Sequence, residues 1–187
     1  MVFDALVLAG GGARRLGGID KASIEVAGRS LLERALAATQ GARHVVVVGP
    51  RRATPVPVEW AREMPVGGGP LEATAAGLAR VTSPLVVVLG VDYPLVDSAV
   101  VQALLDSIGE RDGAALSDAE GVLHYVVGAY RTAALREVIE GRRPEGGGSM
   151  RGVFDTLDIA GVSNERAAFD IDVPHDLERA RALAEDG

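Results

Sequence analysis

Short, continuous apolar runs alternate with amphipathic segments along nearly the whole of this chain. Such runs predict buried strands, because a strand of a parallel sheet is covered on both faces and shows no polar alternation. The segments between them carry apolar residues at helical spacing. The alternation therefore predicts an α/β fold in which a mainly parallel sheet lies between two layers of helices, a Rossmann-like three-layer sandwich.

Turn and capping signals divide the chain into elements. Strands are expected at 3–9, 44–48, 56–60, 85–89, 114–116 and 122–129, with a last strand that ends at 169–172. Helices are expected at 31–38, 71–80, 97–108, 132–139, 150–157 and 174–184. Ser30 and Glu33 have the spacing of a capping box, which satisfies free N–H groups at a helix start. The glycine-rich stretch 141–148 is interpreted as a mobile surface loop.

Length and composition limit what the chain can do. Its 187 residues suffice for a substantial core, so we expect a single domain spanning 1–187. There is no cysteine, which excludes disulfides and thiolate metal sites. A net charge of -7 argues against binding to nucleic acid or a membrane surface, and no apolar run is long enough to span a bilayer. The sequence also lacks a secretion signal, so we expect a cytoplasmic protein.

The segment from Leu8 to Lys21 follows the first predicted strand and holds five glycines, two arginines and a lysine. Glycines bring backbone N–H groups close to a ligand, and successive N–H groups in such a turn form a concavity that binds anions. The cluster of Arg14, Arg15 and Lys21 favours a polyphosphate over solvated surface charge. The segment lacks the Gly-Lys-Ser/Thr of the P-loop, and Arg15 takes the third glycine position of the dinucleotide fingerprint. We therefore expect an extended nucleotide-binding loop of neither common kind.

Three aspartates are expected at the same edge of the sheet. Ligands of open α/β sheets bind outside the carboxyl ends of the strands. Asp92 follows the strongest central strand, and Asp170 and Asp172 follow the last one. A carboxylate beside bound phosphates suits Mg²⁺, whose other ligands are usually water and phosphate oxygens. The alternatives are structural, with Asp92 capping a turn before Pro94 and Asp172 capping the helix that begins at Pro174.

Other polar and aromatic residues carry weaker signals. His124 alternates with apolar neighbours, which is typical of a structural or substrate-lining residue, and the other two histidines have no partner that suggests a triad or a metal site. Trp60 is expected in the core or at its rim rather than stacked on a base. Arg142 and Arg143 are interpreted as a solvated pair, with clamping of an anionic substrate as the alternative. The chain offers no convincing nucleophile.

Four segments resemble motifs of the molybdenum cofactor guanylyltransferases. The segment 8–21 has LAGG, a spacer, RRLGG and, after one residue, DK, as the nucleotide loop of that family does. Residues 68–78 are similar to its G-P-L loop and helix, 91–95 resemble its C-D-x-P metal motif, and 169–177 resemble its F-x-N-x-N-T-P-E-D-L ending. The likeness spans nearly the whole chain and implies a fold like that of the nucleotide-diphospho-sugar transferases.

This resemblance implies a Mg²⁺-dependent enzyme that transfers GMP from GTP to the phosphate of molybdopterin and releases pyrophosphate. The acceptor oxygen is already ionised near neutral pH, so no general base is required. Transient contact with proteins of molybdenum cofactor biosynthesis or with acceptor molybdoenzymes is a further implication. The loop and the resemblance together select nucleotide-binding Leu8, Ala9, Gly10, Gly11, Gly12, Arg14, Lys21 and Asp92, catalytic Arg15, Lys21 and Asp92, the metal ligand Asp92, and pterin-facing Asp170 and Asp172.

The chain departs from the pattern of that family at several positions. Asp170 and Asp172 stand where the family has asparagine, Met64 stands at an acidic position that contacts the nucleotide, and Val48 replaces a frequent asparagine. Three alternatives follow. One is a CTP-dependent sister enzyme that acts on molybdopterin, another is nucleotidyl transfer to a sugar phosphate or isoprenoid precursor, and the third is a nucleotide-binding module without catalysis.

Overall fold

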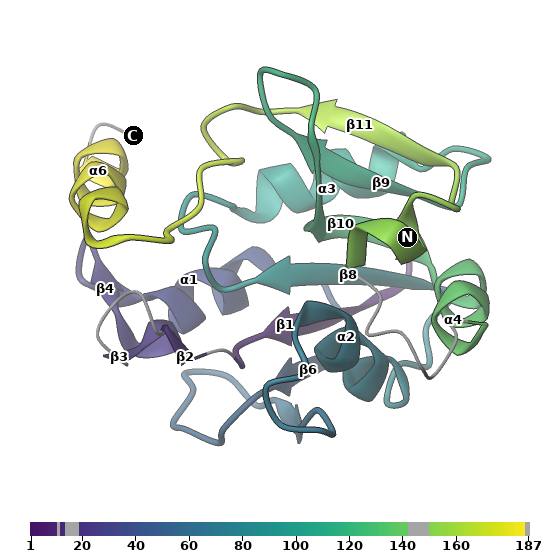
Figure 1. Cartoon of the computed structure of the whole chain (residues 1–187), viewed down its shortest axis with the longest axis horizontal. Helices are drawn as coiled ribbons and strands as arrows, with labels where there is room; N and C mark the ends of the chain where they lie inside the picture. Colours follow the sequence, from purple (N-terminus) through teal and green to yellow (C-terminus); the bar gives the residue numbers. More distant parts are fainter. Residues whose placement is uncertain (11, 14–18, 142–149, 186–187) are drawn as a thin grey trace.

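The computed structural model describes residues 1–10, 12–13, 19–141 and 150–185. Its centre is a seven-stranded sheet in the order β11-β9-β10-β8-β1-β6-β7 (Figure 1). The strands are β1 (Phe3–Leu8), β6 (Val45–Val48), β7 (Glu59–Ala61), β8 (Leu85–Gly90), β9 (Gly113–Ser117), β10 (Leu123–Arg131) and β11 (Ile159–Ser163). Two short hairpins are separate from this sheet, β2 (Gly12–Ala13) with β3 (Ile19–Asp20) and β4 (Glu25–Val26) with β5 (Arg29–Ser30).

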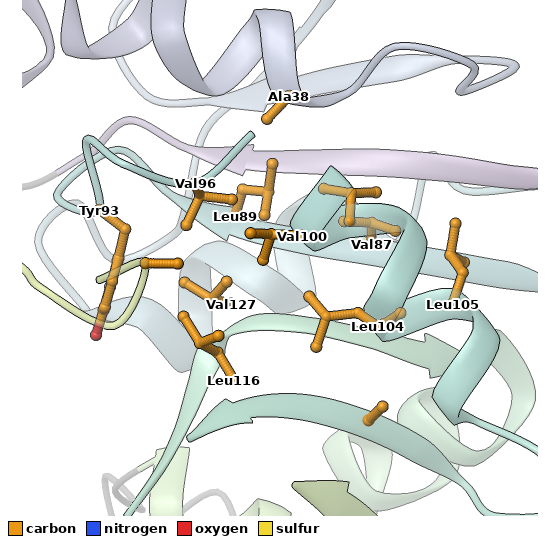
Figure 2. Close-up of a cluster of buried hydrophobic side chains, with 14 of the residues drawn as sticks. Ala38, Val87, Leu89, Tyr93, Val96, Val100, Leu104, Leu105, Leu116 and Val127 are labelled. Carbon is orange, nitrogen blue, oxygen red and sulfur yellow. The ribbon is translucent and has the colours of Figure 1, made fainter. Parts of the chain in front are cut away.

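Helices cover both faces of the sheet. They are α1 (Leu31–Ala38), α2 (Pro70–Leu78), α3 (Ser98–Ser107), α4 (Thr132–Glu140), α5 (Met150–Phe154) and α6 (Pro174–Glu185). On one face, α1 and α6 pack with Val7, and α3 packs its Val100 and Leu104 with Val87 and Leu89 of β8 (Figure 2). On the other face α2, α4 and α5 pack with the alternate residues of the same strands. No helix within the described ranges is long and apolar enough to cross a membrane.

The sheet is mainly parallel. Four neighbouring pairs are parallel, namely β11 with β9, β8 with β1, β1 with β6, and β6 with β7. Strand β10 runs antiparallel to both of its neighbours. The layers and the sheet confirm the α/β fold predicted from the alternating apolar runs. The carboxyl ends of β1, β6 and β8 meet at one edge, which is where ligands of such sheets bind.

A capping box begins α1 as predicted. Glu33 N donates to Ser30 Oγ at 3.2 Å, and Ser30 N donates to Glu33 Oε2 at 2.8 Å. These two hydrogen bonds satisfy two donors that a helix start leaves free. Local sequence signals therefore fix where this helix begins.

The predicted last strand is wrong in its position. The last strand of the structure is β11, which ends at Ser163, and residues 169–172 form no strand. Phe169 and Ile171 alternate with aspartates, which is the pattern of a half-buried strand. Ile171 is nevertheless fully buried outside the sheet, and its N–H donates to Asp92 O at 2.9 Å. The segment thus docks against the sheet edge instead of extending the sheet.

Two further elements, one strand and one helix, are shorter than predicted. The strand expected at 56–60 begins only at Glu59, beyond Pro57, because proline cannot donate to a ladder. The helix expected from Met150 ends at Phe154. Residues 142–149, which hold most of the expected surface loop, lie outside the described residues.

A buried carboxylate, Asp4, ties the amino end of β1 to the turn before β8. Its side chain accepts hydrogen bonds from Thr82 N at 2.7 Å, Ser83 N at 2.9 Å and Ser83 Oγ at 2.7 Å. Burial raises the pKa of Asp4, but these hydrogen bonds and the nearby His44 outweigh it, so the pKa is lowered. Because His44 Nδ1 lies 3.7 Å from Asp4 Oδ1, this histidine belongs to the amino edge, away from the predicted site.

Candidate functional site

The glycine-rich segment begins at the carboxyl end of β1, between β6 and β8 (Figure 1). Ala9 N donates to Val48 O at 2.8 Å, and Val91 N donates to Leu8 O at 3.3 Å. Both neighbouring strands therefore hold the start of the segment. Leu8, Ala9 and Gly10 lie at the edge where the sequence predicted them.

The far end of the segment returns through a short antiparallel stem. Gly12 in β2 pairs with Asp20 in β3. This pairing brings the Asp-Lys end of the motif back toward its glycine start. The predicted site residues Gly11, Arg14 and Arg15 lie outside the described residues.

Lys21 is the only lysine in the chain, a signal that the sequence analysis did not use. Asp20 positions it, because Asp20 Oδ1 accepts from Ala22 N at 3.3 Å and caps the 3-10 helix η2 (Lys21–Ser23). Lys21 Nζ lies 3.3 Å from Asp172 Oδ1 and 3.6 Å from Asp92 Oδ2. An ammonium is a compact point charge that can face two carboxylates at once. The structure thus brings three predicted residues together from three distant parts of the sequence.

Asp92 and Asp170 lie in surroundings that disfavour their negative charge. Burial raises the pKa of Asp92, and the Lys21 ammonium only partly offsets this. Burial also raises the pKa of Asp170, and the charges of Asp172 and Asp92 add to the effect. Additional positive charge at this edge would stabilise the ionised carboxylates.

The oxygen ligands at this edge fit Mg²⁺. Asp92 and Asp172 both face the Lys21 ammonium, and Mg²⁺ is usually held by one or two carboxylates together with phosphate and water oxygens. In the part of the chain that the structure describes, no group of three or more suitable side chains could hold a metal ion. A cation here would therefore depend on the phosphates of a bound nucleotide.

Asp176 takes the capping role at the start of α6 that was the alternative for Asp172. Asp97 caps α3, where its Oδ1 accepts from Val100 N at 2.9 Å. Asp176 Oδ2 accepts from Asp172 N at 2.9 Å and Val173 N at 2.8 Å, which satisfies the start of α6. The carboxylate of Asp172 is instead hydrogen-bonded to Lys21.

The buried glutamate Glu63, which the sequence analysis did not select, faces the start of the glycine segment. A Cβ added to Gly10 would lie 3.2 Å from Glu63 Oε1 and 3.3 Å from Oε2. Oε1 accepts from Gly67 N at 3.2 Å, whereas Oε2 is buried with no hydrogen-bond partner among the described residues. A buried carboxylate oxygen without a donor is costly. This position therefore suits a ligand that brings N–H donors to the carboxylate.

The neighbouring Met64 is 79% exposed. The resemblance to the guanylyltransferases implies an acidic, nucleotide-contacting position at this residue. In the structure the carboxylate that faces the glycine segment lies one residue earlier, at Glu63. The sequence alone did not show which of two neighbouring residues in this irregular loop faces the glycine segment.

The turn after β6 approaches the glycine segment closely. Gly49 has a φ of 153°, and a Cβ there would lie 2.7 Å from Ala9 O and 2.9 Å from Gly10 N. Real Cβ atoms do not approach backbone atoms so closely, so this contact requires glycine. The turn at Gly49 and the Glu63 carboxylate therefore both lie against the start of the glycine segment, at Ala9 and Gly10.

His124 lies near the aspartates but is already hydrogen-bonded on both sides. Its Nδ1 lies 3.0 Å from Tyr93 Oη, and its Nε2 lies 3.3 Å from Asp118 Oδ2. Burial and the charge of Asp92 raise the pKa of Tyr93, so its hydroxyl keeps its proton. With both ring nitrogens engaged, the structural interpretation of His124 is the better supported one.

Two remaining residues have no role at this edge. Trp60 is partly buried against the core cluster around α1 and β1, as expected for a residue at the core rim. His175 is exposed and lies 3.9 Å from Glu178 within α6.

Comparison with known sequences places this geometry among nucleotidyltransferases. The MobA-like NTP transferase domain family matches residues 5–160. A 2-C-methyl-D-erythritol 4-phosphate cytidylyltransferase from Thermus thermophilus is 34% identical, over 98% of this chain and 98% of its own length. A probable molybdenum cofactor guanylyltransferase from Nostoc sp. is 31% identical, over 94% of this chain and 88% of its own length.

Solved structures agree with this fold. The molybdopterin-guanine dinucleotide biosynthesis protein A from Archaeoglobus fulgidus superposes with a TM-score of 0.78 at 20% identity, covering 98% of this chain and 100% of that chain. The Thermus thermophilus cytidylyltransferase superposes with a TM-score of 0.72 at 26% identity, covering 99% of this chain and 100% of that one. The fold is therefore that of the nucleotide-diphospho-sugar transferase-like enzymes.

Proposed function

Because this chain belongs to the MobA-like NTP transferase family, we propose that it transfers GMP from GTP to the phosphate group of molybdopterin. Its family and relatives make it an NTP:phosphate nucleotidyltransferase. The choice of base and acceptor is the proposal. It rests first on the surroundings of one carboxylate.

Glu63 is the observation that favours guanine. Guanine presents two adjacent donors, N1–H and the N2 amino group, and a carboxylate can accept from both. Cytosine offers one amino donor beside the acceptor N3, so it leaves one carboxylate oxygen facing an acceptor. The unpaired Oε2 of Glu63 lies beside Gly10, at the start of the nucleotide-binding segment. This environment therefore suits guanine better than cytosine.

A second candidate is transfer of CMP to 2-C-methyl-D-erythritol 4-phosphate. The full-length 34% identity to the Thermus thermophilus enzyme favours it. Both candidates join a nucleotidyl group to a phosphate and differ in the base and in the acceptor. Glu63 therefore bears directly on the choice between them.

In the proposed reaction an oxygen of the acceptor phosphate attacks the α-phosphorus of GTP. A new P–O bond forms, the bond from the α-phosphorus to the bridging oxygen breaks, and pyrophosphate leaves with the bonding electrons. A phosphate monoester carries roughly 1.5 to 2 negative charges at neutral pH, so the attacking oxygen needs no general base. The protein contributes positioning and charge stabilisation.

The predicted site residues take distinct roles in this proposal. Lys21 stabilises the charge that develops on the leaving pyrophosphate, as do Arg14 and Arg15. Asp92, with Asp172, would hold Mg²⁺, which when bound supplies further positive charge beside the phosphates. In this proposal Asp170 and Asp172 face the pterin. The reaction takes place in the cytoplasm, and the protein makes transient contacts with proteins of molybdenum cofactor biosynthesis or with acceptor molybdoenzymes.

Thermal unfolding with GTP, CTP, ATP and UTP in the presence of Mg²⁺ tests the nucleotide. We expect GTP to raise Tm selectively, because a ligand that binds only the folded state stabilises it. Pyrophosphate release is then measured with molybdopterin and with 2-C-methyl-D-erythritol 4-phosphate as acceptors. Selective stabilisation by CTP with turnover of the erythritol phosphate would replace this proposal by the second candidate. Stabilisation by a nucleotide without pyrophosphate release would indicate a nucleotide-binding module without catalysis, and no response to any nucleotide would overturn the proposal.

A further inference from the structure

The side chain of Arg52 bridges the two ends of the glycine-rich segment. Arg52 lies between β6 and β7, and its side chain is 18% exposed. Its Nη2 lies 2.7 Å from Asp20 Oδ2, and its Nη1 donates to Ala9 O at 3.4 Å. Ala9 is the last residue before the glycines, and Asp20 is the residue before Lys21. One planar side chain therefore contacts both ends of the segment.

Asp20 transmits this contact to Lys21. The two carboxylate oxygens of Asp20 are used separately, Oδ1 for Ala22 N and Oδ2 for Arg52. The first contact caps the turn that carries Lys21, and the second fixes the direction of the carboxylate. An arginine fork suits this task, because its N–H donors point in fixed directions and can engage two acceptors at once.

The turn that carries Arg52 is itself fixed against the segment. Gly49 begins this turn and lies in close contact with Ala9 and Gly10. The ion pair with Asp20 is partly exposed to solvent, at 43% for the aspartate side chain. Partly exposed ion pairs contribute little to the stability of a whole fold. The contact is therefore better suited to positioning Ala9 and Asp20 than to holding the domain together.

We propose that Arg52 is a positioning residue for nucleotidyl transfer. By clamping both ends of the glycine-rich segment, it holds Lys21 and the Ala9 backbone in the positions that bind the triphosphate. This inference rests on the proposed nucleotidyl transfer but not on the identity of the base. Arg52 acts through Asp20 and through the Ala9 carbonyl. Its loss weakens the use of the nucleotide and leaves the use of the acceptor unchanged.

A double-mutant cycle of Arg52→Ala and Asp20→Asn tests the clamp. Asp20→Asn keeps an oxygen for Ala22 N and removes the charge that faces Arg52. We expect kcat/KM for the nucleotide to fall by about 10- to 100-fold in Arg52→Ala, because small displacements of catalytic groups have effects of this size. The KM for the acceptor and Tm stay close to the wild-type values. The double variant is no worse than the more impaired single variant, since both changes break the same contact.

Two comparisons sharpen this test. Arg52→Lys restores part of the activity, because an ammonium can neutralise Asp20 but lacks the two separate nitrogens with which the guanidinium reaches Asp20 and Ala9 O. Arg111→Ala serves as the matched control, since it removes an exposed ion pair with Asp158, at 2.6 Å, from the far edge of the sheet. Its kinetic constants remain at the wild-type level.

The outcomes separate this inference from the proposed function. A wild-type protein that transfers nucleotides, with an Arg52→Ala variant as active as the wild type, overturns the role of Arg52 alone. Additive losses in the double variant, or an equal rise in the KM of the acceptor, overturn it as well. A wild-type protein that binds none of the four nucleotides overturns the proposed function and the clamp together.

Discussion

Lys21 and Asp172 are 151 residues apart in the chain, yet Lys21 Nζ donates to Asp172 Oδ1 at 3.3 Å. The same ammonium lies 3.6 Å from Asp92. The Lys21 ammonium therefore connects the first loop with Asp92, at the end of the central strand β8, and with Asp172, just before α6. This relationship, more than any single motif, defines the candidate site.

Substitution of Lys21 or Asp92 should stop turnover without unfolding the protein. We expect Lys21→Ala and Asp92→Ala each to lower the transfer rate by at least about 10²- to 10³-fold, because each removes charge stabilisation from the transition state. Lys21→Arg should also be impaired, since a planar guanidinium does not reproduce a point charge between two carboxylates. Pyrophosphate release measures the loss, and circular dichroism checks the fold. Near-normal turnover in either alanine variant would contradict the mechanism.

The single lysine makes the site chemically addressable. We expect an anionic, amine-directed reagent such as pyridoxal phosphate with borohydride to modify Lys21, and GTP with Mg²⁺ to protect it. Peptide mass spectrometry distinguishes Lys21 from the amino terminus, which serves as the internal control. Equal labelling of Lys21 with and without nucleotide would show that the triphosphate binds elsewhere.

Glu63→Gln should change base selectivity. The amide keeps one acceptor oxygen but places an NH₂ group where guanine also donates, so GTP loses a favourable contact and gains a repulsive one. We expect kcat/KM for GTP to fall by about 10- to 100-fold relative to CTP, as for the loss of a bidentate base contact. Met64→Gln, at the exposed neighbouring position, is the control and should keep the wild-type ratio. An unchanged GTP-to-CTP ratio in Glu63→Gln would remove the argument for guanine.

Gly49→Ala should damage the nucleotide loop through a backbone clash. Its Cβ would lie 2.7 Å from the Ala9 carbonyl carbon and oxygen, so the turn or the loop must move. We expect a destabilisation of about 1–3 kcal/mol, as for overpacked sites, together with weaker nucleotide binding. Gly121→Ala is the matched control, because Gly121 also has a positive φ, of 78°, but a Cβ there meets no atom within 4 Å. Equal effects of the two substitutions in denaturant unfolding and nucleotide titration would contradict this explanation.

Asp4 should make the fold sensitive to acid. Its pKa is lowered in the folded state, so its contribution to stability is fully present above the unfolded-state pKa, near 3.9, and is lost as pH falls through the folded value. We expect Asp4→Asn to cost about 1–3 kcal/mol at neutral pH, because an amide leaves buried donors of the 82–83 turn poorly paired. The difference from wild type should shrink in acid, as measured by urea unfolding across this range. A pH-independent difference would assign the cost to packing instead.

The fold was predictable because its signals are local and periodic. The buried strands are continuous apolar runs, and the start of α1 depends on Ser30 and Glu33, three residues apart. The segment 169–172 was wrongly predicted as a strand because its apolar and polar residues alternate. Its apolar side chains pack in the cluster that includes residues of α1 and α6, and its backbone does not join the sheet. Alternation reports which side chains are buried and does not report what covers them.

The candidate site was predictable only where its residues belong to motifs. Lys21 follows the glycines and Asp92 follows β8, so their shared edge could be inferred, whereas Asp172 was placed there from a strand that the structure does not have. Glu63 and Arg52 lie in irregular loops, and their roles depend on contacts with Gly10 and Ala9, more than 40 positions earlier. Such contacts leave no periodic trace in one sequence.

The docking of Ile171 onto Asp92 also bears on the order in which the site is assembled during folding. Strand β1 precedes the other strands of the sheet in the sequence, and Asp172 follows Lys21 by 151 residues. Contacts between residues far apart in the sequence are slow to form, because closing the chain between them costs entropy. The sheet can therefore be in place while the Lys21 ammonium still lacks one of its two carboxylate partners, Asp172. In the proposed reaction, activity would then appear only after residues 169–172 dock against the sheet edge, so its onset would report that this docking is complete.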